Sequence, residues 1–203
     1  MGLGLLLPAS LAWAFTVSYD QTVRMGSEES QSKVVIRDRM FRIEQTVDTH
    51  LRVTVRNPRG IFVYYPQDSI GAQINAMDAS QRQLLDHAAN FPEYLRRQNA
   101  RLVTEESIRE LACEVYLVED RSAGDPMKVW LWKEEHFPLR LQVISGRGKI
   151  TVDLRNIQLG VSAPAALFEL PIGLKLTDPD TLRAFKPRQV EVPQPVADAD
   201  ISG

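Results

Sequence analysis

The residues that most often carry chemistry in proteins are few in this chain and lie far apart in the sequence. The three histidines are His50, His87 and His136, and the one cysteine is Cys113. No two of these residues have the spacing of a zinc site. The sequence motifs of serine hydrolases, zinc proteases and phosphate-binding glycine loops are absent. We therefore expect no metal site, no cofactor and no catalytic residues.

Adjacent carboxylates are the remaining candidates for acid–base chemistry, and they occur at Glu28–Glu29, Glu105–Glu106 and Glu134–Glu135. Neighbouring side chains on a strand point to opposite faces of a sheet, so such a pair rarely converges on one substrate. Cys113 belongs to an inward, apolar row within residues 111–117, which indicates a buried core thiol rather than a nucleophile. We do not expect an enzyme.

The composition narrows the class of protein further. The chain has 203 residues and a formal net charge of −2, enough for one large domain or two small ones. A near-neutral chain lacks the broad positive field of nucleic-acid-binding proteins. No apolar run reaches the length of about 18 residues that a membrane-spanning helix needs. A single cysteine cannot form an intrachain disulfide, so the fold depends on its hydrophobic core.

Residues 1–14 predict a signal peptide, because they are apolar and end in the small-x-small pattern Ala12-Trp13-Ala14. No basic residue precedes Arg24, so a misplaced chain start, or a buried strand or helix, is the alternative. Cleavage after Ala14 would leave a chain that starts at Phe15, with no cysteine there to carry a lipid anchor. We expect an exported, unanchored, soluble protein.

Alternation of apolar and polar residues dominates the rest of the chain and predicts about ten strands. Turns are expected at 57–60 and 145–148. Strands with one apolar side are typical of an antiparallel sheet, and the order of elements has no βαβ rhythm. The fold class is therefore α+β, with a single curved antiparallel sheet. The alternating segments are 15–25, 33–37, 41–44, 51–56, 61–65, 111–118, 129–132, 139–143 and 150–155.

The middle of the chain predicts two short amphipathic helices at about 78–98. Asp78 and Gln81 have the spacing of an N-cap and its reciprocal partner, and Asn90-Phe91-Pro92 predicts the start of the second helix. A sheet this large curls toward a barrel, and its apolar face becomes the inside. Two short helices would leave part of that interior unfilled, which indicates an apolar ligand cavity.

The segment Val129-Trp130-Leu131-Trp132 has apolar residues on both faces of one strand. Either the helices cover one face and a loop or the tail covers the other, or one face lines a lipid cavity. The stretch after Leu176 is rich in proline, and Asp178-Pro179 could cap one short helix. We expect residues 177–203 to form a C-terminal tail.

Four stretches, at 32–44, 60–66, 128–140 and 167–175, together resemble the periplasmic outer-membrane lipoprotein carriers and lipoprotein-sorting proteins, the LolA-like family. The last of them reads Leu-Phe-Glu-Leu-Pro-Ile-Gly-Leu-Lys and is similar to the family's closing signature. The resemblance covers residues 15–176. It implies an incomplete β-barrel with a helical lid and an apolar interior that accepts acyl chains.

The resemblance also implies roles for particular residues. In the lipoprotein carriers an arginine and a following phenylalanine at the mouth of the cavity contribute to ligand release or lid closure, and Arg37 and Phe41 stand at the matching places. The proline after that arginine is absent here, so Arg39 is an equally good match. The other residues expected at the cavity are Ile43, Leu51, Val53, Val55, Val63, Tyr65, Leu84, Phe91, Trp130 and Trp132.

The expected function is a periplasmic carrier or chaperone that binds the acyl chains of lipoproteins, or another lipid, during outer-membrane biogenesis. The alternative is an envelope-stress sensing or regulatory module that binds a lipid or lipoprotein without transporting it. The expected partners are a lipid or an acylated protein, together with lipoprotein-handling proteins of the inner or outer membrane. We expect a monomer that does not bind nucleic acid.

Overall fold

The computed structural model describes residues 14–75, 77, 84–119, 125–145 and 148–185. Residues 84–87 are helical and continue into η2 (Ala88–Asn90) and α2 (Phe91–Arg97). The other helical elements are η1 (Pro66–Asp68), η3 (Ala165–Phe168) and α3 (Pro179–Ala184). The strands are β1 (Thr16–Met25), β2 (Glu28–Arg37), β3 (Met40–Val47), β4 (His50–Asn57), β5 (Gly60–Tyr65), β6 (Ile70–Ile74), β7 (Arg101–Ile108), β8 (Leu111–Val118), β9 (Met127–Trp132), β10 (Pro138–Ser145), β11 (Gly148–Leu159) and β12 (Lys175–Thr177).

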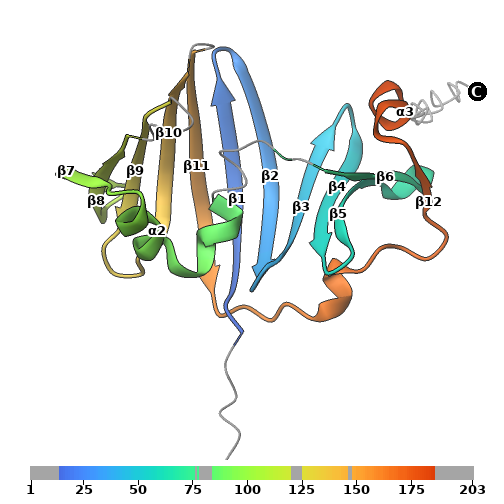
Figure 1. Ribbon diagram of the computed structural model, residues 1–203, viewed down its shortest axis with the longest axis horizontal. Helices are drawn as coiled ribbons and strands as arrows, with labels where there is room; N and C mark the ends of the chain where they lie inside the picture. Colours follow the sequence, from blue (N-terminus) through green and yellow to red (C-terminus); the bar gives the residue numbers. More distant parts are fainter. Residues whose placement is uncertain (1–13, 76, 78–83, 120–124, 146–147, 186–203) are drawn as a thin grey trace, which may run out of the picture.

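These strands form one sheet in the order β12-β6-β5-β4-β3-β2-β1-β11-β10-β9-β8-β7. Neighbouring strands are antiparallel except for β12, which runs parallel to β6. The end strands β12 and β7 do not pair with each other, so the sheet is curved but not closed (Figure 1). The expected incomplete barrel, built on a single large and mostly antiparallel sheet with a helical insert, is confirmed.

Helix α2 forms where the sequence predicts it. The Asn90 side chain accepts a hydrogen bond from the Glu93 backbone N–H at 3.2 Å, and Pro92 occupies the first turn, where its missing N–H costs nothing. Glu93 in turn accepts hydrogen bonds from Arg96 and Arg97 along the exposed side of the helix. The predicted cap at Asp78 and Gln81 lies outside the described residues.

Residues 84–97 cover one face of the sheet, which we call the lid face, and the opposite face is the outer face (Figure 1). The main hydrophobic core lies between the lid and the lid face. Arg56 on β4 forms an ion pair with Asp86 and so links the lid to the sheet. The lid contributes Leu84, Leu85, Ala88, Phe91, Tyr94 and Leu95, and the sheet contributes Val17, Tyr19, Val34, Ile36, Phe41, Ile43, Val118, Met127, Val129, Leu131, Phe137, Leu141, Val143 and Leu154.

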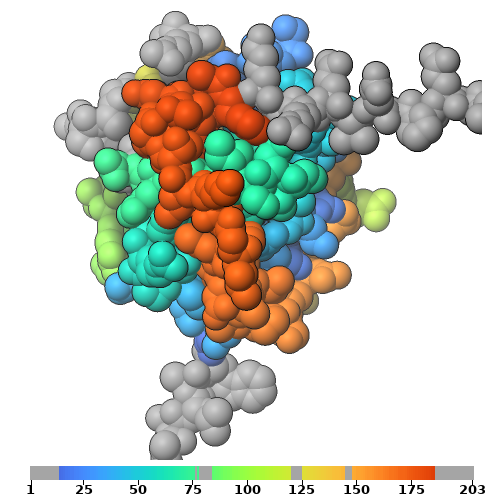
Figure 2. Space-filling view, turned by 90° about the vertical axis from the view of Figure 1, so that its right-hand side faces the viewer, coloured from blue at the N-terminus to red at the C-terminus, as the bar shows by residue number. Residues whose placement is uncertain are grey.

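A second core lies on the outer face of β4 and β5, under residues 163–174, which we call the strap. Figure 2 shows the strap, in orange, running across these strands. Phe168 of the strap is buried at 1% exposure. The Arg37 guanidinium donates to the Ala163 carbonyl at 3.0 Å, and the Asn57 amide donates to the Phe168 carbonyl at 3.0 Å. The strap therefore closes the outer face at this end of the sheet.

The chain then passes the edge of the sheet as β12 and returns to the lid face as α3. Leu182 and Phe185 pack there against Tyr65 and neighbouring residues of β5 and β6. The Asp178 carboxylate caps the helix by accepting from the Thr181 backbone N–H at 2.8 Å. The predicted short helix after Asp178 is confirmed.

Three strands were not predicted from the sequence: β6, β7 and β12. Of the predicted signal peptide, only Ala14 belongs to the described part of the chain. The tail from residue 186 onward also lies outside the described part. No helix in the described part of the chain has the length and apolar character needed to cross a membrane.

Candidate ligand cavity

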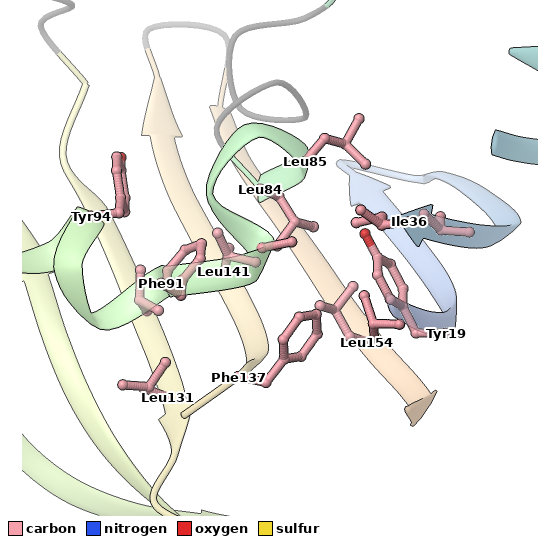
Figure 3. Close-up of a cluster of buried hydrophobic side chains, with 14 of the residues drawn as sticks. Tyr19, Ile36, Leu84, Leu85, Phe91, Tyr94, Leu131, Phe137, Leu141 and Leu154 are labelled. Atoms are coloured by element: carbon pink, nitrogen blue, oxygen red, sulfur yellow. The ribbon is translucent and has the colours of Figure 1, made fainter. Parts of the chain in front are cut away.

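A cavity of about 230 Å³ lies on the lid face, between Leu84 of the lid and strands β1, β2, β3, β4, β10 and β11. Figure 3 shows Leu84 pointing from the helical segment toward the sheet, where Leu141 lies. Most of the wall is aliphatic, which suits an aliphatic ligand. The apolar lining residues are Val23, Ile43, Leu84, Leu141, Val143, Ile150 and Val152.

The register of the strands adds a row of polar residues to this wall. Gln21 pairs with Ser32, Ser32 with Gln45, and Gln45 with Arg52, so these four residues cross β1 to β4 side by side on the lid face. We call them the polar row, and all four line the cavity, together with Ser30. The Arg52 guanidinium donates to the side-chain oxygen of Gln45. The cavity is therefore amphipathic rather than purely apolar.

Two polar atoms on the lid face of β1 lack hydrogen-bond partners within the part of the chain that the structure describes. They are Oε1 of Gln21, a residue with 4% exposure, and the hydroxyl oxygen of Tyr19, a residue with 1% exposure. Burial raises the pKa of the Tyr19 phenol, so the group stays protonated. A buried unpaired acceptor such as Gln21 Oε1 costs about 1–3 kcal/mol, and a ligand that supplies a donor would recover this cost.

A wider groove, of about 820 Å³, lies mainly on the outer face of β1, β2 and β3. Asp20, Glu29, Lys33, Glu44 and Arg155 are among its lining residues, and aliphatic residues are few. Such a surface offers little apolar area to an acyl chain. The lid-face cavity is therefore the better candidate for a lipid.

The structure brings some of the expected site residues to the lid face. Ile43 and Leu84 line the cavity. Phe41 and Phe91 lie in the adjoining core with 2% and 0% exposure. At the far end of the lid face Val63 and Tyr65 pack under α3.

Other expected site residues lie on the outer face. Leu51, Val53 and Val55 pack in the core beneath the strap, because the register pairs Val53 with Glu44 rather than with Ile43. Arg37 also lies on this side, where it holds the strap at Ala163. None of these residues lines the lid-face cavity.

Trp130 and Trp132 also lie on the outer face, whereas Val129 and Leu131 belong to the core under the lid. The Trp130 indole N–H donates to Glu106 Oε2 at 2.7 Å. The centroid of the Trp130 ring lies 4.5 Å from the Lys128 ammonium and 5.7 Å from the Arg140 guanidinium. Among the described residues, the core under the lid covers one face of β9, and side chains of β7, β10 and β9 itself surround Trp130 on the outer face.

Cys113 is fully buried, as expected of a core thiol, and burial raises its pKa. Its row belongs to the outer-face cluster with Trp130, so the expectation that the row points inward, toward the lid, is wrong. Among the described residues no three His, Cys, Asp or Glu side chains come close enough to hold a metal ion.

No protein-family model and no curated protein matches the sequence. Solved structures match at low identity. MucB superposes with a TM-score of 0.50 at 14% identity, over 78% of this chain and 58% of MucB. The complex of MucA and MucB from Pseudomonas aeruginosa gives a TM-score of 0.47 at 15% identity, over 80% of this chain and 58% of the matched chain. A LolA superfamily protein from Nitrosomonas europaea gives 0.38 at 14% identity, over 77% and 90%.

The chain spans less than two thirds of the MucB chain that it matches. At such low identity the similarity concerns the fold alone. The match to MucB, with a TM-score of 0.50, is a similarity to the large open sheet described above.

Proposed function

We propose that the protein binds an acyl chain of a lipid or lipoprotein in the lid-face cavity and acts as a carrier or chaperone for it. The observation that carries this proposal is the space that the described residues leave between Leu84 and the aliphatic side chains of β1, β3, β10 and β11. Well-packed protein interiors leave few voids larger than a water molecule. The cavity of about 230 Å³ is partly open, borders the main core at Leu84, Leu141 and Val143, and is far larger than such a void.

The volume sets the size of the ligand segment. A water molecule occupies about 30 Å³ in the liquid, and a methylene group is of similar size, so the cavity holds about eight such groups. At about 0.8 kcal/mol per buried methylene, the gross stabilisation is ~6 kcal/mol. The loss of translational and rotational freedom on binding offsets part of this. The outcome is reversible binding of one chain, which suits a carrier that must release its cargo.

Export to the periplasm is part of the proposal. It is supported by the apolar segment that ends in Ala12-Trp13-Ala14, directly before the first strand. In this arrangement the half-barrel begins at Phe15, and the cavity protects an acyl chain from water on its way between two membranes.

Native mass spectrometry of the protein purified without detergent from its own host tests this function. We expect a population that carries one acyl lipid, which solvent extraction removes. Extracted protein should then bind dansylundecanoic acid with an increase in dansyl fluorescence. A uniformly ligand-free protein that also fails to bind the dansyl probe would contradict the proposal. Recovery of a membrane signalling protein without any lipid would instead support the regulatory role.

A further inference from the structure

We propose that the ligand is a single-chain amphiphile whose head group lies at the polar row and carries both a hydrogen-bond donor and an anionic oxygen. Gln21 accepts from the donor, and Arg52 with Ser30 and Ser32 donates to the anionic oxygen. This inference deepens the proposed function and rests on it, because the acyl chain occupies the aliphatic part of the same cavity.

The donor requirement follows from Gln21. The Gln21 side chain lines the cavity and is only 4% exposed. Its Oε1 has no hydrogen-bond partner among the described residues. An amide oxygen in that position can only accept, so it needs an N–H or O–H group. Its strand partners on both sides offer none in the structure: the hydroxyl of Ser32 is not bonded to it, and Leu154 is apolar.

The anionic requirement follows from the other polar lining residues. Arg52 contributes a full positive charge, and its described contacts include a hydrogen bond to the neutral Gln45 side chain but no ion pair. No Asp or Glu of the described residues lines the cavity. A guanidinium has five N–H donors and the two serine hydroxyls can add two more, so an anionic oxygen would find several donors here.

The order of the side-chain rows on the sheet indicates where the head group and the acyl chain of the ligand would lie. Next to the polar row, Val23 of β1 pairs with Val152 of β11, and Val152 pairs with Leu141 of β10. One end of the cavity is therefore aliphatic and lies over β10 and β11, whereas the polar end lies over β2, β3 and β4. An amphiphile with one chain and a compact head group matches this division.

An ionised fatty acid supplies the anionic oxygen but no donor. Two lipid classes supply both: an N-acyl amino acid, through its amide N–H and carboxylate, and a lysophospholipid, through its glycerol hydroxyl and phosphate. The shared chemistry is one acyl chain followed by a donor and an anion. Isothermal titration calorimetry with delipidated protein can separate the two sources, using N-decanoylglycine, a decanoyl lysophosphatidylglycerol and sodium decanoate as probes.

The decisive comparison is N-decanoylglycine against N-decanoylsarcosine, which differ by the methyl group that removes the amide N–H. We expect the glycine compound to bind about tenfold more tightly, because only its amide N–H can pair with the buried acceptor Gln21 Oε1. Gln21→Leu should abolish this preference, and Gln31→Leu, on the outer face of the next strand, should leave it intact. Arg52→Gln should weaken every anionic probe by about tenfold.

Thermal melts of both leucine variants establish that they fold, and Gln21→Leu should not lower the melting temperature of the ligand-free protein, because it removes a buried unpaired atom. Equal affinity for the two amino-acid compounds in the parent protein, or a preference that survives Gln21→Leu, would overturn the head-group inference while leaving acyl binding in place. Failure of every decanoyl probe and of dansylundecanoic acid would overturn the proposed function as well. Tighter binding of the lysophospholipid than of N-decanoylglycine would support the inference with a phospholipid as the source.

Discussion

Filling the cavity with a side chain should block acyl binding without unfolding the protein. Val23 is the position for this test, because it lines the cavity and is only half-buried, so a larger side chain has room to adjust. In Val23→Trp the indole would occupy much of a space that holds about eight methylene-sized groups. If the indole excludes about four methylene groups of the ligand, the binding free energy weakens by ~3 kcal/mol. This corresponds to an increase of about a hundredfold in the Kd of an acyl ligand.

The assay is a fluorescence titration of dansylundecanoic acid into delipidated protein, with circular dichroism melts of each variant. Thr22→Trp is the matched control, because residue 22 follows the same strand but its side chain lies on the outer face, where it lines the polar groove. We expect the control to bind the probe like the parent protein. If Val23→Trp folds normally and binds as tightly as Thr22→Trp, the acyl chain does not occupy this cavity.

Three further predictions concern the scaffold around the cavity. Phe168→Ala removes the buried ring of the strap and should lower the free energy of unfolding by about 3–5 kcal/mol in urea titrations. Gly71→Ala should destabilise the pairing of β5 and β6 by about 1–3 kcal/mol, because a Cβ there would meet Tyr64 Cβ at 2.7 Å; a melting temperature equal to that of the parent would contradict this. Hydrogen bonds from Arg96 and Arg97 lower the pKa of Glu93 to about 2, so its stabilising contribution is present above pH 4.5 and is lost as the pH falls toward 2. Parent and Glu93→Gln proteins should therefore differ in stability at pH 7 and converge near pH 2.

The strands with strict alternation could be predicted from the sequence, because each has one buried and one wetter side. The start of α2 was also predictable, since Asn90 and Pro92 are local signals that need no tertiary contact. Strand β7 has no such pattern: seven of its eight residues are exposed, because it lies at the edge of the sheet. Strand β12 has three residues and forms only by pairing with the distant β6.

Alternation could not assign the apolar rows to faces. In β3 the apolar residues Phe41 and Ile43 face the lid, whereas in β4 Val53 and Val55 face the strap. Both strands look alike in sequence, and only the register between them separates the two rows, because a shift of one residue moves every side chain to the other face. The strap, far along the chain, gives the outer row its cover, and no local pattern reveals that contact.

The polar row was missed for a different reason. Gln21 interrupts an otherwise apolar row of β1 that includes Tyr19 and Val23, and this interruption was a visible signal. Its partners Ser32, Gln45 and Arg52 come from three other strands, and the register alone brings them together. A polar residue in an apolar strand row can therefore be singled out from the sequence. The residues that surround it can be identified only from the register of the folded sheet.

Photo-crosslinking with a diazirine-labelled decanoic acid tests most directly whether the lid-face cavity is the acyl site. After irradiation of delipidated protein, peptide mapping should find the label on residues of β10 and β11 that line the cavity, Leu141, Val143 and Val152 among them, and an excess of unlabelled decanoic acid should suppress it. Saturable labelling confined to outer-face residues such as Val53 or Trp130 would contradict acyl binding in this cavity.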